Sequence, residues 1–248
     1  MRYCLIKLHI LIPKSIKRQL KNFFACVLGW SIMCGSAFAI PLSQDLQQSQ
    51  ASVQRVSDWR TLVFESTHLS DREKLRRVNA FFNRTIRYGE DTDVWSQADY
   101  WASPLETLEK GRGDCEDFAL AKYFTLRLLG IPEDSLRLVY ATQAKTRQAH
   151  MVLGYWADAG TEPVLLDNLE DGIRSFVQRN DLKAEFAFDE LNLYNFDHAA
   201  LQRVGSVGQL PNWLALVQRT RREASDLANA AASGTQSGLL LSAVSLEH

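Results

Sequence analysis

The stretch GRGDCEDFALAKYFTLRLLGIP (residues 111–132) contains a helix start, a helix end and, between them, one cysteine. Asp114 is a residue type that caps helices, so we expect a helix beginning at Cys115. Gly130 is typical of the position after a helix end, which places the last turn near Leu129. Cys115 then lies in the first helical turn, where unpaired backbone N–H groups lower the pKa of a thiol and favour the nucleophilic thiolate.

Three carboxylates next to this thiol act in the opposite direction. Asp114, Glu116 and Asp117 would raise the pKa of a neighbouring thiol. A reactive Cys115 therefore needs a general base close by, a cation that neutralises the acids, or both. Two ordinary interpretations stay open: the cysteine can be an inert buried thiol, and the acids can simply complement the helix dipole.

Among the histidines, His150 is the best candidate for the base because it opens a predicted strand, 149–156. His68 lies in a predicted loop and His198 in a helix-start context. Asp167 follows one strand later, within plausible reach of His150 if the two strands are antiparallel neighbours. Cysteine, histidine and aspartate in this order form a nucleophile, a base and an orienting group, although each is also common as a structural residue.

Helices are predicted before the cysteine and strands after it. Ser70 and Glu73 fit a capping box, and Ser103 followed by Pro104 predicts a second, short helix. Segments rich in Val, Leu and aromatic residues then predict an antiparallel meander over 135–143, 149–156 and 163–169, with further strand residues at 174–178 and 186–191. A closing helix is predicted over 212–227. Helices followed by antiparallel strands indicate an α+β fold.

The N-terminus has the pattern of an export signal. Residues 2–21 carry six basic residues and no acidic one, and the apolar stretch that follows ends in Ala37-Phe38-Ala39. This pattern predicts a signal peptide over residues 1–39 that is cleaved after Ala39, with an uncleaved membrane anchor as the alternative. Cleavage would leave Cys115 as the only cysteine, so the mature chain could form no internal disulfide.

The remaining 209 residues or so can build one domain of ordinary size. We assign a flexible lead-in segment to the Ser/Gln-rich residues 40–54, a single domain to 55–227, and a disordered tail to 228–248, in which Leu246-Glu247-His248 resembles an expression tag. Without the six basic leader residues, 22 Lys and Arg face 29 Asp and Glu, a net charge near −7. This charge disfavours nucleic acid as a partner.

Three segments, GDCEDFALAKYFTLRLLGIP, AHMVLGYW and PVLLDNL, resemble the bacterial transglutaminase-like cysteine proteinases, over roughly residues 75–195. The resemblance implies a papain-like or transglutaminase-like α+β fold, with a helical N-terminal part and the cysteine at the N-terminus of a core helix packed on an antiparallel sheet. It also implies that 55–227 is one cysteine-proteinase domain, with Cys115 as nucleophile, His150 as general base and acid, and Asp167 as orienter.

The same resemblance implies a calcium ion close to the nucleophile. The matching ligand positions are Asp114, Glu116 and Asp117, and Asp91 or Asp93 could complete the shell. Calcium takes several oxygen ligands, and here it would offset the carboxylates that raise the pKa of the thiol. The family pattern further implies an oxyanion hole with a side-chain donor upstream of the cysteine. The candidates for this donor are Trp95, Gln97 and Tyr100.

By resemblance, the substrate is the N-terminal region of a large cell-surface biofilm adhesin, cut at a pair of adjacent alanines. The implied partner is the periplasmic domain of an inner-membrane cyclic-diguanylate receptor that sequesters the protease. We therefore expect a periplasmic protein that is not membrane-embedded after cleavage of its leader. Two other functions remain open: a transglutaminase-like acyl transferase, which would give cross-linked products, and a non-catalytic periplasmic binding module.

Overall fold

The computed structural model describes residues 39–158, 160–197 and 200–232. The predicted signal peptide, apart from Ala39, and the predicted tail beyond residue 232 lie outside these ranges. Within them, no helix is both long and apolar enough to cross a membrane.

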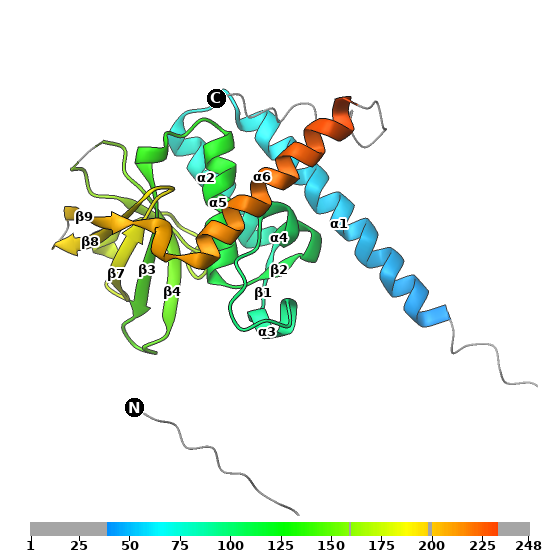
Figure 1. Cartoon of the computed structure of the whole chain (residues 1–248), viewed down its shortest axis with the longest axis horizontal. Coiled ribbons are helices and arrows are strands. Elements are labelled where there is room, and N and C mark those ends of the chain that lie inside the picture. The colour runs from blue at the N-terminus through cyan, green and yellow to red at the C-terminus, as the bar shows by residue number, and fades with distance from the viewer. Residues whose placement is uncertain (1–38, 159, 198–199, 233–248) are drawn as a thin grey trace, which may run out of the picture. The chain divides into compact units, whose positions relative to one another are not determined.

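The chain divides into two units, Met1–Pro41 and Leu42–His248, and all elements except the first residues of α1 belong to the second. In chain order, the elements (Figure 1) are α1 (Ala39–Ser66), α2 (Asp71–Thr85), β1 (Arg87–Tyr88), α3 (Asp91–Val94), α4 (Pro104–Lys110), β2 (Arg112–Gly113), α5 (Cys115–Leu128), η1 (Glu133–Ser135), β3 (Leu136–Gln143), β4 (Ala149–Tyr155), β5 (Val164–Leu166), β6 (Arg174–Ser175), η2 (Phe176–Gln178), β7 (Leu182–Phe188), β8 (Asn192–Asp197), β9 (Ala200–Ser206), η3 (Val207–Gln209) and α6 (Pro211–Ala232).

The large sheet has the strand order β6-β5-β4-β3-β7-β8-β9, and all its pairings are antiparallel. The predicted meander corresponds to β3, β4 and β5, and the α+β fold is confirmed. Strand β5 is shorter than predicted because the chain leaves the sheet at Asp167. The backbone carbonyl of Asp167 there accepts a hydrogen bond from Asn83 Nδ2 at 2.8 Å instead of a bond from a strand.

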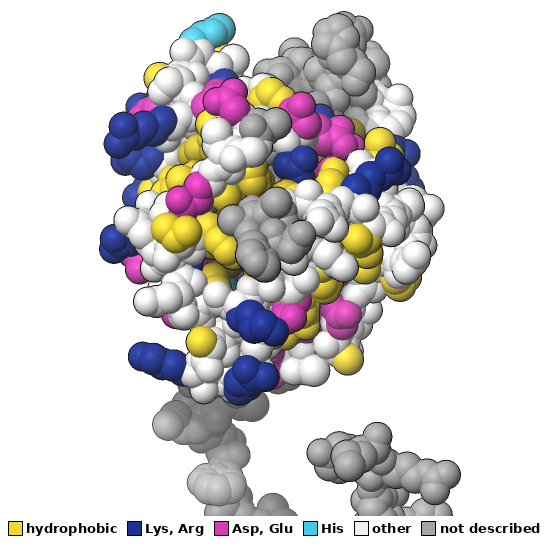
Figure 2. Space-filling view, turned by 90° about the vertical axis from the view of Figure 1, so that its left-hand side faces the viewer, with side chains coloured by type: hydrophobic (Ala, Val, Ile, Leu, Met, Phe, Trp, Pro, Cys, Tyr) yellow, Lys and Arg dark blue, Asp and Glu magenta, His cyan; other side chains and the backbone are white. Residues whose placement is uncertain are grey.

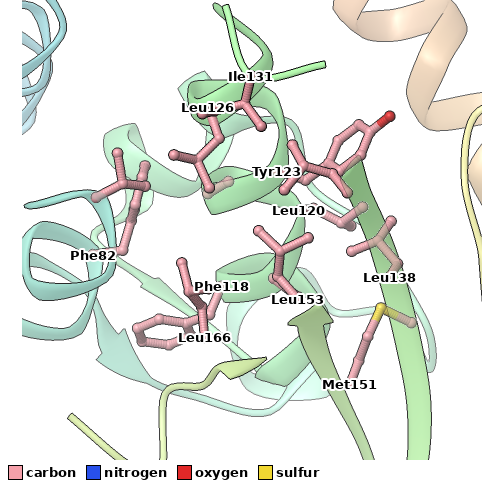
Figure 3. Packing of buried hydrophobic residues seen from close by; sticks show 14 of the residues in the cluster. Phe82, Phe118, Leu120, Tyr123, Leu126, Ile131, Leu138, Met151, Leu153 and Leu166 are labelled. Carbon is pink, nitrogen blue, oxygen red and sulfur yellow. The ribbon is translucent and has the colours of Figure 1, made fainter. Parts of the chain in front are cut away.

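Helix α5 lies at the centre of the hydrophobic core. It packs against α2 on one side and against β3 and β4 on another, and its buried side chains are directed into the space between helix and sheet (Figure 3). Leu120, Tyr123 and Leu126 are fully buried, as are Leu138 and Leu153 on the sheet. Each such side chain contributes roughly 1.5–3 kcal/mol, so the position of the α5 N-terminus is fixed by the packing of the whole helix.

The opposite face of the sheet carries a second, smaller hydrophobic cluster. Its buried members are Val139, Ala141, Val152, Trp156, Leu165, Leu182 and Ala187. A Cβ atom at Gly154 would lie 2.6 Å from the Trp156 ring, so this glycine allows the indole to lie against β4. Figure 2 views the side on which β7, β8 and β9 lie in Figure 1, and hydrophobic side chains show there between charged ones.

Residues 40–54 differ from the flexible segment that we expected, because they lie within helix α1. Their polar side chains led to the expectation, yet Gln, Leu and Ala are good helix formers. The helix is anchored further along. The Trp59 indole N–H donates to Thr125 Oγ1 of α5 at 2.9 Å, and Arg55 Nη2 donates to the carbonyl oxygen of Glu109 at 2.7 Å.

Asp114 caps α5 as expected, but of the helix starts expected at Ser70 and Ser103 only the second forms its side-chain bonds. Ser103 and Glu106 make a complete capping box at the start of α4. Ser70 occupies the N-cap position of α2 but makes no side-chain cap bond. The Glu73 carboxylate, which would complete that box, accepts hydrogen bonds from Arg76 and Arg77 instead.

One polar side chain of α5, Lys122, is completely buried within this core. Its Nζ has no hydrogen-bond partner among the described residues and lies 5.7 Å from the centre of the Phe118 ring. Burial lowers the pKa of Lys122 to about 7, against the opposing charges of Asp167 and Asp171.

We predict that Lys122→Met stabilises the protein, by about 1–4 kcal/mol, because it replaces a buried cation with an apolar side chain of similar length. In the unfolded chain this lysine titrates near 10.5 and in the folded chain near 7. The cost of burying its charge is therefore complete below pH 7 and decreases as the pH rises towards 10.5.

Urea unfolding at pH 6 and pH 9 checks this prediction. The gain in unfolding free energy should be larger at pH 6, and Lys145→Met, at an exposed lysine, should show neither gain nor pH dependence. A variant at Lys122 that loses stability at both pH values would contradict the prediction.

Candidate active site

A short parallel ladder brings two distant segments together at the start of α5. Tyr88 of β1 pairs with Gly113 of β2, and the Gly89 N–H donates to the Gly113 carbonyl at 2.9 Å. Asp91 and Asp114, which follow these strands, therefore meet. A Cβ atom on Gly113 would lie 2.5 Å from Asp117 Oδ2, so only glycine leaves room for that carboxylate.

Cys115 and His150 line one cavity of about 350 Å³ at this place. Its walls combine carboxylates with aromatic rings. The lining residues are Tyr88, Glu90, Asp91, Thr92, Ala98, Asp99, Trp101, Asp114, Cys115, Glu116, Tyr140, Ala149, His150 and Met151. The nucleophile candidate and the base candidate thus share a solvent-accessible space that a substrate could enter.

Asp167 holds the imidazole of His150 through a bond of 2.8 Å between Oδ1 and Nε2. Both side chains are buried. Burial alone would raise the pKa of Asp167, but the hydrogen bond and charge of His150, the Leu169 N–H and Arg179 together hold it below its ordinary value. An ionised Asp167 keeps the proton on Nε2, which leaves Nδ1 as the ring nitrogen available to Cys115.

Sequence reasoning missed two residues that hold Asp167. Arg179 Nη2 donates to Asp167 Oδ2 at 2.7 Å, and Asn83 Nδ2 donates to the Asp167 carbonyl. Arg179 follows the last turn of η2 and Asn83 lies on α2, and neither position carries a local pattern that indicates a role. Only the packing of these elements around the end of β5 reveals them.

The Cys115 thiol faces a carboxylate in this structure. Its Sγ donates to Glu116 Oε2 at 3.0 Å. Burial raises the pKa of Cys115, Glu116 raises it further, and a hydrogen bond from the Met151 backbone acts in the opposite direction. Burial and the flanking acids therefore both act against the helix start, and a cation among the acids would offset only their part.

The predicted calcium ligands divide into two groups that share Asp91. Asp91, Asp114 and Asp117 form one group, and Asp91, Asp99 and Glu116 form the other, with the oxygen atoms of each group within 4.8 Å of one another. Of the two residues considered for the rest of the shell, Asp91 belongs to both groups. Asp93 is exposed and belongs to neither, and Asp99 was not foreseen.

The three acids of the first group are nearly buried, and their charges repel one another. Burial, followed by Glu116 and Asp117, raises the pKa of Asp114 to about 10, and burial raises the pKa of Asp117 to about 7. Asp91 Oδ1 is buried without a hydrogen-bond partner in the described part of the chain. Buried carboxylates with a free oxygen fit a hard divalent cation such as calcium.

The three candidates for an oxyanion-hole donor do not line the cavity. The Trp95 indole N–H donates to Asp117 Oδ2 at 3.4 Å, and the Tyr100 hydroxyl donates to Glu106 Oε1 at 2.7 Å. Gln97 is exposed. Trp95 and Tyr100 are thus used to hold the loop that carries the acids.

Comparison with known proteins places the chain in a family. A family model described as "Bacterial transglutaminase-like cysteine proteinase BTLCP" matches residues 47–182, more than half of the chain. A structure of EGTA-treated LapG from Legionella pneumophila is 35% identical, with a TM-score of 0.62, and the match covers 72% of this chain and 96% of LapG. The chain belongs to the bacterial transglutaminase-like cysteine proteinases.

A second structure of Legionella pneumophila LapG, described as calcium-bound, is 36% identical with a TM-score of 0.62, and the match covers 74% of this chain and 99% of that one. These likenesses confirm the family resemblance and the transglutaminase-like fold inferred from the sequence. No curated protein matched the chain.

We predict that Gly113→Ala destabilises this proteinase by roughly 1–3 kcal/mol, because the added Cβ must displace the Asp117 carboxylate. That carboxylate is buried and accepts a hydrogen bond from the Ala102 N–H at 2.8 Å, so it cannot move without losing this bond. Gly205→Ala is the matched control, since nothing lies within 4 Å of its added Cβ. Chemical unfolding measures both variants, and equal stability of the two would contradict the prediction.

Proposed function

We propose that the chain is a calcium-dependent cysteine endopeptidase that uses Cys115, His150 and Asp167. The observation that carries this proposal is the shared cavity, in which a thiol at a helix N-terminus and a His–Asp pair lie together in a member of a cysteine proteinase family. The helix start aims backbone N–H groups at the thiol, and the Asp167 bond fixes the imidazole in the tautomer that a base needs.

In the proposed reaction, Cys115 Sγ attacks the scissile carbonyl carbon and its proton passes to His150 Nδ1. The C–N bond then breaks, the leaving amine takes the proton from Nδ1, and a thioester to Cys115 remains. Water attacks this thioester while Nδ1 accepts a proton from the water. The carboxylate product leaves, and the thiol is regenerated with the returned proton. Asp167 stays ionised throughout and stabilises the imidazolium.

Asp91, Asp114 and Asp117 would hold the calcium ion, with Glu116 and Asp99 at the adjoining group. A bound cation would offset the negative charges that raise the pKa of Cys115. The likeness to a calcium-bound LapG structure at 36% identity supports this proposal. The free oxygen of Asp91 and the raised pKa values of its neighbours support it independently of any relative.

We extend the proposal to substrate and regulation on the basis of the family resemblance. The substrate would be the N-terminal region of a large cell-surface adhesin, cut at adjacent alanines. A periplasmic receptor domain controlled by cyclic diguanylate would sequester the enzyme. The predicted signal peptide would deliver the enzyme to the periplasm, where it could bind the adhesin and the receptor domain.

We predict that Cys115→Ala and His150→Ala abolish cleavage of the adhesin fragment while the variants stay folded. His68→Ala, at an exposed histidine outside the cavity, should cleave like the unmodified protein. Gel electrophoresis of the mature protein with the N-terminal region of any giant adhesin found encoded beside it gives the readout. Full cleavage by Cys115→Ala would refute the nucleophile, and cross-linked products in place of new termini would indicate an acyl transferase.

We also predict that a calcium chelator stops cleavage and that added calcium restores it. Calcium at 100 times its dissociation constant should stabilise the fold by about 2.7 kcal/mol, which thermal unfolding detects as a rise in Tm. Asp117→Asn should reduce both effects because it removes a buried ligand. Asp93→Asn, outside both acidic groups, is the matched control. Equal activity and equal Tm with chelator and with calcium would contradict the metal assignment.

A further inference from the structure

The side of Asp167 that faces away from His150 is held by an arginine. Oδ1 of this carboxylate accepts from His150 and from the Leu169 N–H, whereas Oδ2 accepts from Arg179 Nη2 at 2.7 Å. The Asp167 side chain has no exposed surface and that of Arg179 is 5% exposed. Water therefore competes little with this bond, and a charge-assisted bond of this length is among the stronger ones in proteins.

Arg179 is itself fixed from two directions. Asp181 accepts two hydrogen bonds from it, at 2.9 Å from Nε and 2.8 Å from Nη2. Its backbone N–H donates to the Phe176 carbonyl, and its carbonyl accepts from the Leu182 N–H, both at 3.0 Å. The two backbone bonds fix the main chain at Arg179, and the two bonds to Asp181 fix the plane of its guanidinium, whose Nη1 has no hydrogen-bond partner among the described residues.

These contacts form a row of alternating charges that ends at the candidate base. The half-exposed Asp181 forms an ion pair with Arg179. Arg179 in turn pairs with Asp167, and Asp167 pairs with His150. His150 and the Leu169 N–H both bond to Oδ1, and a carboxylate held through one oxygen can still rotate about its Cβ–Cγ bond. The bond from Arg179 to Oδ2 fixes the plane of the carboxylate.

We propose that Arg179 is a positioning residue for the reaction: it orients the Asp167 carboxylate and thereby keeps His150 in the tautomer with its proton on Nε2. This inference rests on the proposed function of the Cys115, His150 and Asp167 group. Arg179 touches neither the cavity nor a reacting atom, so it acts only through Asp167.

The test compares Arg179→Met with Arg174→Met; Arg174 is a nearby exposed arginine whose ion pair, within the described residues, is with Glu170. For Arg179→Met we expect kcat on the cleaved substrate to fall on the order of 10- to 100-fold, with KM unchanged, because misorientation affects the reaction more than binding. Arg179→Lys should recover part of this loss, since lysine restores the charge but not the two-pronged geometry. Arg174→Met should behave like the unmodified protein.

Nitrogen-15 NMR of His150 provides a readout that a purely structural role would not change. The unmodified protein, Arg174→Met and Asp93→Asn should show one tautomer, protonated at Nε2, whereas Arg179→Met should show a mixture of tautomers. A single Nε2–H tautomer in a folded Arg179→Met variant, or a loss of kcat that Arg179→Lys does not reduce, would overturn the inference.

Two further comparisons keep the test decisive. If Arg179→Met does not fold, Asp181→Asn replaces it, because this change weakens the bonds that hold Arg179 on its exposed side. We expect Asp181→Asn to lower kcat a few-fold. An unchanged kcat together with a single His150 tautomer in this variant would overturn the inference. The NMR signal does not depend on turnover. Cleavage that persists in Cys115→Ala therefore rejects the proposed function, whereas an unchanged tautomer in Arg179→Met rejects this inference alone.

Discussion

The burial of several carboxylates around one thiol is the constraint on which the rest of this structure depends. Asp91, Asp114 and Asp117 are nearly inaccessible to water, although like charges at such distances repel one another. The fold holds them with specific contacts. The Tyr100 N–H donates to Asp91 and the Ala102 N–H to Asp117, while glycine at 113 leaves the space that Asp117 fills. An arrangement this costly for stability is typical of a functional site.

Two groups of residues have opposite effects on the ionisation of the Cys115 thiol. On one side, burial and then the neighbouring acids raise the pKa of Cys115. On the other side, His150 can take its proton, and Asp167 favours the resulting imidazolium. The balance between these groups decides whether the cysteine is reactive. A cation among the acids would shift the balance towards the thiolate. The acidic cluster and the His–Asp pair would then act together on the ionisation of Cys115.

Local signals in the sequence were sufficient to predict the central helix and the antiparallel meander. Asp114 and Gly130 mark the ends of α5, and runs of apolar residues mark β3, β4 and β5. The antiparallel neighbourhood of β4 and β5 also brought His150 and Asp167 together as expected. Helix α1 was missed because its early residues are polar and its anchor, Trp59, lies beyond them. The β1–β2 ladder, Asp99 and Arg179 could not be foreseen, because two-residue strands and long-range ion pairs leave no periodic pattern.

The rate at which iodoacetamide alkylates Cys115 at pH 7 tests the central claim most directly, because the thiolate is the reacting form. Cys115 is the sole cysteine after the predicted cleavage, so the signal is unambiguous. If a cation offsets the acids, alkylation should be at least about ten times faster in calcium than in chelator, which corresponds to one unit of thiol pKa. Equal rates under the two conditions, or a faster rate in chelator, would contradict the account.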